Sequence, residues 1–173
     1  MSTKFKLAVV LAVAAASATA PLVASPSAPG AAGPVFQSIG PLAFGPGDVL
    51  FAGDRDAATI QALTLGAEAN GGAAGTADVT GIDQKIAAVL GTSAAEIAIT
   101  DLAVHPRTHN SYVSVMRGQG ADAKPALLRV DGAGQITVVN FANVTATSVS
   151  LPNPPAANPG ARQNPRTQTI MDL

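Results

Sequence analysis

Short, mostly apolar runs separated by turn residues make up most of the chain between Val35 and Phe141. The runs 49–52, 112–116 and 126–130 hold four or five residues each, and each is followed closely by Gly and polar residues. β-Strands have this length and end at such turn residues, whereas a helix needs a longer run with a period near 3.6 residues. The pattern therefore predicts an all-β fold, with strands near 39–44, 49–52, 59–65, 99–104, 112–116, 126–130 and 135–141. The first two strands are close enough to form a hairpin, Asp54–Asp56 is a polar turn, and Asp131–Gly134 makes a tight hairpin turn. Tyr112, Ser114 and Met116 should lie on one face of their strand, with Val113 and Val115 on the other.

One segment departs from this pattern. Apolar residues from Ile82 to Leu90 recur at the spacing of one helix face, and Gly91 is placed to end a helix. The stretch Ser93–Glu96 has a capping-box pattern, which predicts a second short helical turn. We therefore expect a helical insert over residues 82–97.

The N-terminus has the composition of a secretory signal peptide. Lys4 and Lys6 precede an apolar run of ten residues, Leu7–Ala16, which is too short to span ~30 Å of hydrocarbon. Ala16-Ser17-Ala18 fits the small-x-small cleavage pattern, and a second match two residues later is followed by proline, which hinders cleavage. We predict a signal peptide over 1–18, with a buried apolar helix as the alternative. Export would place the mature protein in the periplasm or outside the cell.

The composition excludes several kinds of partner and site. Without residues 1–18 the chain keeps eight of its ten Lys+Arg and all eleven Asp+Glu, so no basic stripe predicts nucleic acid binding. No later apolar stretch has membrane-spanning length, so no membrane span is expected after signal cleavage. The absence of cysteine excludes disulfides, thiolate metal sites and cysteine nucleophiles. Residues 19–34, rich in Pro, Ala, Ser and Gly, are expected to form a flexible lead-in.

Two stretches of the chain match each other. Gly40–Pro46 aligns with Thr100–Pro106, since each contains Leu-Ala, an apolar residue, one spacer and Pro. The residues Ile170–Leu173 repeat Ile99–Leu102 and look like a third start of the same motif. The shared leucines lie 60 and 71 residues apart, or 44 and 49 once the helical insert and a Pro-rich loop are set aside. β-Propeller blades of four strands repeat at roughly 40–50 residues.

The repeated motif resembles a known family. Leu42–Phe51 followed by Asp54 resembles the blade opening of NHL and SMP-30/gluconolactonase-like β-propellers, and Asp101–Pro106 with Tyr112–Val115 resembles the next blade. With the signal peptide, the chain is most similar to exported bacterial propeller proteins. The resemblance covers about residues 38–173 and implies a fold more than a function, because many unrelated activities occur on propellers.

The repeat suggests how residues 35–173 are organised. We expect a partial β-propeller. About two blades and the start of a third are too few to close a propeller ring. Its expected parts are blade one (38–66), the helical insert (82–97), blade two (98–146), a Pro-rich loop (147–168) and the start of blade three (169–173). The sequence therefore reads as the N-terminal part of a longer protein. The alternative is a complete small β-sandwich or barrel with two related halves.

Candidate site residues are few. Asp54, Asp101 and Asp172 are candidate metal ligands. The resemblance implies that Asp101 and Asp172 start innermost strands near a central channel, where SMP-30-like enzymes hold a divalent cation, and calcium favours such oxygen ligands. Those enzymes also use a glutamate near the start of blade one, where this chain has Gly40. The alternative role of each aspartate is to cap its own turn. His105 and His109 stand four residues apart, but Pro106 indicates a turn, so we expect both rings to be exposed to solvent.

Three functions remain open from the sequence. No Gly-x-Ser-x-Gly, phosphate-cradling glycine loop or His-Glu-x-x-His motif is present. This favours a non-catalytic binding or scaffold module of an exported propeller, with no cofactor. The first alternative is a metal-dependent, lactonase-like hydrolase that uses calcium and has further ligands in other blades. The second alternative is a self-contained β-sandwich surface protein.

Overall fold

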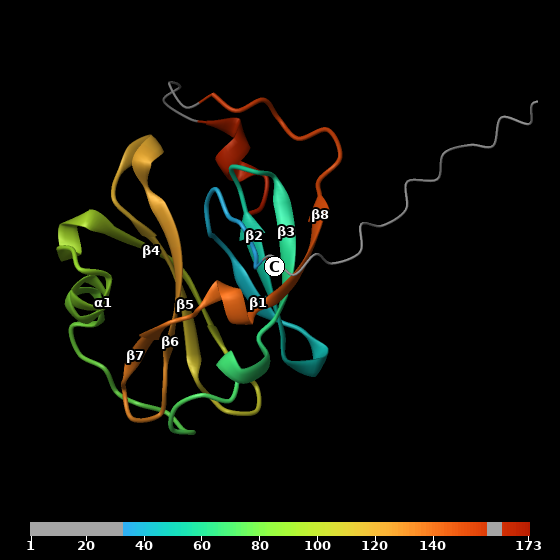
Figure 1. Ribbon diagram of the computed structural model, residues 1–173. Coiled ribbons are helices and arrows are strands. Elements are labelled where there is room, and N and C mark those ends of the chain that lie inside the picture. Colours follow the sequence, from blue (N-terminus) through green and yellow to red (C-terminus); the bar gives the residue numbers. More distant parts are fainter. Residues whose placement is uncertain (1–32, 159–163) are drawn as a thin grey trace, which may run out of the picture.

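The computed structural model describes residues 33–158 and 164–173 (Figure 1). The predicted signal peptide, 1–18, and most of the predicted lead-in, 19–34, lie outside these residues. The described part contains two four-stranded antiparallel sheets, one α-helix and several short 3-10 turns. The all-β prediction is confirmed at this level, since the structure is mostly sheet.

The first sheet consists of three consecutive strands and a fourth strand from later in the chain, all antiparallel to their neighbours. Its strands lie in the order β1-β2-β3-β8, and their bounds are β1 (Leu42–Phe44), β2 (Val49–Asp54), β3 (Thr59–Thr64) and β8 (Thr145–Ser150). The predicted hairpin between β1 and β2 is present, with Leu42 opposite Ala52. Gly47 has a φ of 70° in the connecting turn, a left-handed conformation that glycine adopts without steric cost.

The second sheet consists of consecutive strands joined by hairpins. Its order is β4 (Ile97–Val104), β5 (Ser111–Arg117), β6 (Lys124–Val130) and β7 (Ile136–Val138). The register between β4 and β5 shifts between Ile99 and Asp101, which leaves Thr100 as the extra residue of a β-bulge. The predicted tight turn after β6 is closed by Gly134, whose φ is 78° and whose N–H donates to Asp131 O at 2.8 Å.

The fourth strand of the first sheet was not predicted. The sequence placed 98–146 in the second blade and 147–168 in a loop, but the structure pairs β8 with β3 along six residue pairs, from Thr59–Ser150 to Thr64–Thr145. The predicted boundary at residue 146 is therefore wrong, and the loop begins after Ser150. The prediction failed because local turn signals assign a strand to its neighbours in the chain, whereas β8 returns to a strand about 85 residues earlier.

The predicted start of a third blade contains no strand in the structure. Residues 169–173 follow a 3-10 turn, Pro165–Gln168, and have no ladder partner among the described residues. Ile170 is buried against the first sheet, because Gly53 leaves the space that a β-carbon would occupy 2.9 Å from Ile170 Cγ2. Packing of the Ile170 side chain therefore anchors the C-terminal segment on the first sheet.

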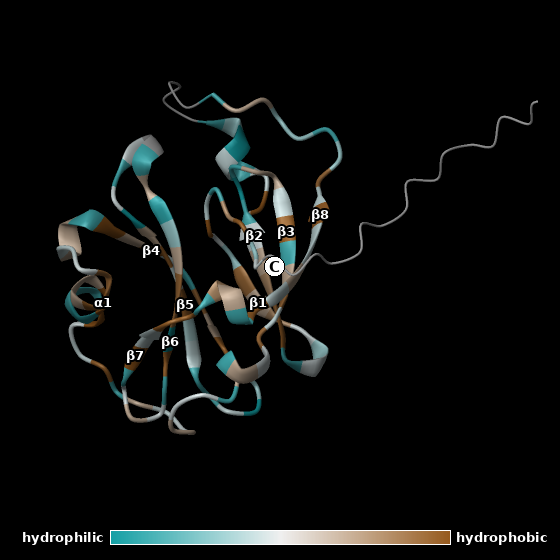
Figure 2. Cartoon of the chain, viewed as in Figure 1, coloured by the Kyte–Doolittle hydropathy of each residue, from teal (hydrophilic) through white to brown (hydrophobic). Residues whose placement is uncertain are grey.

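Hydrophobic packing joins the two sheets face to face. Leu50 and Leu63 of the first sheet share one core cluster with Tyr112 and Leu127 of the second. Figure 1 shows the two sheets side by side. Burying each of these leucines contributes about 1.5–3 kcal/mol. Brown, hydrophobic stretches run along the strands in Figure 2, and more hydrophilic colours lie at several turns.

The helix covers the other face of the second sheet. Ile86 of α1 (Ile82–Leu90) packs against Val113, Val115 and Leu128, whereas Tyr112 faces the first sheet. This confirms the predicted alternation of side chains along β5. Gly91 ends α1 in a left-handed conformation, as predicted, with a φ of 67°. Ser93 stands at the start of the next 3-10 turn, but its side chain makes no capping hydrogen bond.

The connection after β3 packs onto the second sheet. The Tyr112 hydroxyl and the Arg129 Nη1 both donate to Glu68 O, each at 2.8 Å. Burial raises the pKa of Tyr112 to about 12. Asp131 accepts hydrogen bonds from the backbone of its own turn and from Ala73 N at 3.1 Å, and these backbone donors lower the pKa of Asp131. The loop thus belongs to the packed structure.

No helix within residues 33–158 and 164–173 combines the length and the apolar character that a membrane crossing requires.

Candidate functional site

Asp54 is a buried anchor at the end of β2. Its two carboxylate oxygens accept hydrogen bonds from Gln37 N at 2.7 Å, from Ser38 N and Oγ at 3.0 Å, and from Ala57 N at 3.0 Å. The bond to Ala57 is the turn cap that the sequence offered as the alternative to a metal role. The other bonds tie the segment before β1 to the first sheet.

Asp101 joins the first strands of the two sheets. Its Oδ2 accepts a hydrogen bond from Leu42 N at 2.7 Å. Beside it, Thr100 Oγ1 donates to Ile39 O at 2.8 Å, and Ser114 Oγ donates to Gly40 O at 2.9 Å. Asp101 therefore bonds across the sheet interface, which sequence reasoning did not predict.

Asp172 lies apart from the other two candidates. It is exposed, and its only hydrogen bond within the described residues is to the neighbouring Leu173 N at 2.9 Å. Among residues 33–158 and 164–173, no three His, Asp or Glu side chains come together as a metal-binding group. Within the described residues the structure thus does not bring Asp54, Asp101 and Asp172 together, and the calcium site that the resemblance implies stays a prediction.

His105 is buried, so the prediction that its ring is exposed is wrong. Its exposed fraction is 0%, and the ring of Phe44 packs edge-on with the centroids 4.9 Å apart. His109 is exposed, as predicted, and has a left-handed φ of 60°. The burial of His105 depends on the first sheet, which carries Phe44 and is about 60 residues away in the chain. No local pattern reports this contact.

The hydrogen bonds of His105 define its tautomer. Its Nδ1 accepts from Arg107 N at 3.3 Å and from Thr108 N at 3.1 Å, so the proton of the neutral ring lies on Nε2. Nε2 is 3.2 Å from Asp48 Oδ1, but its N–H is not aligned with the oxygen and makes no hydrogen bond within the described residues. Arg107 pairs with the second oxygen of Asp48.

Burial lowers the pKa of His105, and the charge of Arg107 adds to this effect, while the carboxylate of Asp48 opposes it. The ring is therefore neutral near pH 7. Because His105 has no solvent-exposed surface, its imidazole cannot reach a substrate unless the turn opens. His105 and Arg107, with Phe44 and Asp48, thus form a joint between the β4–β5 turn of one sheet and the β1–β2 turn of the other.

A pocket of about 420 Å³ lies at the opposite end of the sheet interface from this joint. Arg55 and Asp56 from the β2–β3 turn line it, together with Met116 at the end of β5, Gln119 and Thr167. Arg55 is half-buried, and no carboxylate of the described residues lies within 4.0 Å of its guanidinium. All eleven Asp and Glu residues are among those described.

Gly40 creates the space for the guanidinium. A β-carbon at Gly40 would lie 2.8 Å from Arg55 Nε, so any larger residue there would displace the side chain. The sequence marked Asp54-Arg55-Asp56 only as a polar turn. In the structure the Arg55 guanidinium pairs with neither neighbouring carboxylate.

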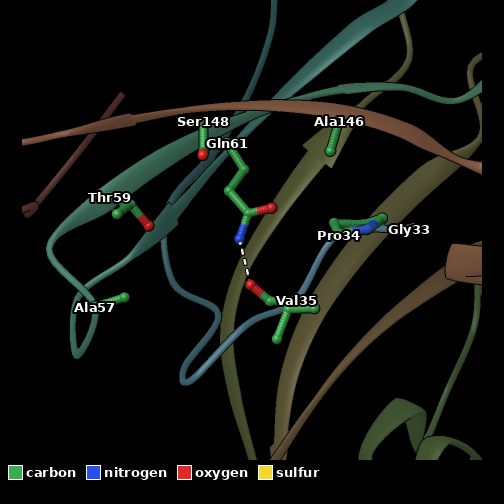
Figure 3. Close-up of a pocket in the computed structure, with 8 residues that line it drawn as sticks. All are labelled: Gly33, Pro34, Val35, Ala57, Thr59, Gln61, Ala146 and Ser148. Carbon is green, nitrogen blue, oxygen red and sulfur yellow. Dashed lines mark hydrogen bonds between the residues drawn. The ribbon is translucent and has the colours of Figure 1, made fainter. Parts of the chain in front are cut away.

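A second pocket, of about 300 Å³, lies between residues 33–35 and the strands β3 and β8 (Figure 3). Its described lining carries no charged side chain, and its largest polar group, the Gln61 amide, donates to Val35 O at 2.7 Å. The amide nitrogen of Gln61 is therefore already bonded to the backbone of the protein. The Arg55 pocket is therefore the better candidate for a ligand site.

Comparison of the chain with family models, with curated proteins and with solved structures found no match.

Proposed function

We propose that this chain is an exported, non-catalytic binding module made of two propeller-type blades, which binds a small carboxylate-bearing ligand in the Arg55 pocket. The repeated Leu-Ala motif, which lies in β1 and near the end of β4, supports the blade assignment, as do the two four-stranded antiparallel sheets. The contact between β1 and β4 also supports it, because first strands are the innermost strands of neighbouring blades.

The unpaired guanidinium carries the ligand proposal. Arg55 forms no ion pair within the described residues, although it is half-buried and faces a pocket large enough for a small molecule. A guanidinium presents two parallel N–H donors that match the two oxygens of a carboxylate. Met116 and Ala98 provide an apolar wall for the rest of such a ligand.

Thermal unfolding with added ligand tests this function. Succinate and citrate should raise Tm in a saturable way. At a concentration of 100 times Kd, binding adds about 2.7 kcal/mol to the free energy of unfolding. Arg55→Gln should abolish the effect. Arg55→Lys should weaken it, because an ammonium keeps the charge but loses the paired donors. Lys85→Gln, a change to an exposed cation on α1, should leave it intact.

The controls separate site binding from general salt effects. Glycerol, which carries no charge, should give no saturable shift, and inorganic phosphate shows whether any anion suffices. Equal stabilisation of all four proteins by carboxylates would mean that the salts act by exclusion from the protein surface, and the proposed ligand site would be wrong.

A further inference from the structure

The contact between the two copies of the repeated motif shows how one copy binds the next. The middle of β4 binds the segment 39–42, which leads into β1 of the first sheet, because Asp101 Oδ2 accepts from Leu42 N at 2.7 Å and Thr100 Oγ1 donates to Ile39 O at 2.8 Å. Leu42 is only 6% exposed and belongs to the core between the sheets. One copy of the repeated motif is thus covered by the next copy along the chain.

The second copy of the motif has no such cover among the described residues. Leu102 occupies the position of Leu42 in the repeat, yet it is 53% exposed, and its neighbours Ile99 and Val104 are 42% and 48% exposed. We call these three residues the β4 strip. Ile99 and Leu102 lie opposite Val115 and Val113 in the ladder, so the strip is on the face of the second sheet that points away from the first.

The β4 strip has the features of an incomplete interface. Strand β4 pairs only with β5 and is the edge of its sheet in the described structure. Exposed apolar edge strands associate readily unless charge or proline protects them. The one charged residue of β4, Asp101, is bonded towards the first sheet and leaves the strip uncharged. Helix α1 covers part of the same face but leaves the strip exposed.

The third copy of the motif is the complementary element. Ile170–Leu173 repeats Ile99–Leu102, so Asp172 corresponds to Asp101. Ile170 is anchored on the first sheet at Gly53. Beyond it, Met171 is 72% exposed and Leu173 is 40% exposed, and Asp172 makes no hydrogen bond to another strand in the described residues.

The two elements lie on opposite outer faces of one molecule. Gly53, where Ile170 is anchored, alternates along β2 with Leu50 and Ala52, two residues of the core between the sheets, so it faces away from the second sheet. The β4 strip faces away from the first sheet. The segment 171–173 therefore meets a β4 strip only on a second copy of the chain.

We propose that copies of this protein associate head to tail, with Met171–Leu173 of one copy docked on the β4 strip of the next. Asp172 then accepts a hydrogen bond from Leu102 N, as Asp101 accepts one from Leu42 N within the chain. The contact continues the existing interface between the sheets onto the free face of β4. It joins two different surfaces, so it is heterologous. The inference rests on the repeat and on exposure, and it does not depend on the Arg55 pocket.

Sedimentation velocity of the protein purified from expression of the whole chain tests the contact. The average sedimentation coefficient should rise with protein concentration. Leu102→Lys and Asp172→Lys should each weaken association about tenfold or more, since each places a cation in the joint. Val89→Lys is the matched control: Val89 is 44% exposed, but it lies on α1 outside the strip, so this variant should associate like the parent protein.

Mixing the two defective variants gives the sharpest result. Leu102→Lys keeps an intact segment Met171–Leu173, and Asp172→Lys keeps an intact β4 strip. In an equimolar mixture the intact segment can dock on the intact strip, so association should recover through this one contact. A parent protein that stays monomeric at all concentrations, or a mixture without recovery, would overturn the proposal. Circular dichroism checks folding, and Asp172→Lys tests the joint even if Leu102→Lys does not fold, because the Asp172 side chain contributes no bond to the described sheets.

Discussion

At the scale of single residues, His105 links the β4–β5 turn of one sheet to the β1–β2 turn of the other. A histidine before proline in a polar turn is ordinarily exposed. Here Phe44 of the other sheet packs on the ring, and two backbone N–H groups bind its Nδ1. The result is a buried, neutral imidazole that joins two turns.

This burial predicts a pH-dependent stability. Because the pKa of His105 is lowered in the folded state, the unfolded state binds more protons below its own pKa of about 6.5. The contribution of His105 is fully present above this pH and is lost as the pH falls towards the folded-state pKa. The free energy of unfolding, measured by urea denaturation from pH 7.5 to 5, should therefore fall, by at most about 1.4 kcal/mol per pH unit for this one group.

Two variants test whether His105 causes this change of the free energy of unfolding with pH. His105→Asn keeps an acceptor for the turn but does not titrate, so the slope between these pH values should largely disappear, although stability is lower overall. His109→Gln removes the only other histidine, which is exposed, and should keep the slope. A slope that persists in His105→Asn would show that another group is responsible.

At the scale of secondary-structure elements, β8 is the strand that distinguishes the structure from the sequence prediction. Its first three residues, Thr145-Ala146-Thr147, alternate between polar and apolar as in a half-buried strand, but the segment lies beside a Pro-rich stretch that indicates a loop. Pairing with β3 places Ala146 opposite the buried Leu63 and packs it against the core. Thr147 is exposed.

Two adjacent substitutions test this register. Ala146→Asp should destabilise the protein by about 2 kcal/mol, because it places a charge against the core. Thr147→Asp should change stability by no more than about 0.5 kcal/mol, because that side chain points to solvent. Urea denaturation measures both. Equal losses of stability in the two variants would show that β8 does not have this register.

At the scale of the whole molecule, one core holds both sheets. Leu50, Leu63, Tyr112 and Leu127 come from different sheets and share a single cluster, so neither sheet retains its buried face without the other. The helix α1 adds a second cluster on the far face of the second sheet. This arrangement predicts that the two sheets fold as one cooperative unit.

Thermal unfolding tests this cooperativity. The far-ultraviolet signal reports the backbone, and the near-ultraviolet signal of Tyr112, the single tyrosine in a chain without tryptophan, reports the interface. The two transitions should coincide. Leu50→Ala should lower the stability seen by both probes by about 3 kcal/mol, because it opens a cavity between the sheets. Val149→Ala, a change to an exposed residue of β8, should have little effect. Separate transitions would show that the sheets unfold independently.

The sequence by itself determined the elements that depend on local patterns. Seven of the strands, the helix 82–90 with its end at Gly91, and the hairpin closed by Gly134 follow from side-chain period and turn residues. Alternation also assigned the two faces of β5. These features rest on interactions between residues a few positions apart, which a linear pattern records.

Only the tertiary structure decided the pairing of β8, the burial of His105, the isolation of Arg55 and the bond from Leu42 to Asp101. Each depends on groups that the fold brings together from distant parts of the chain, such as Leu42 and Asp101, which are 59 residues apart. The sequence could identify three aspartates as candidate ligands, but it could not show that they point to three different places. The cost of leaving polar groups unpaired and apolar surface exposed selects among long-range arrangements, and no local pattern encodes that choice.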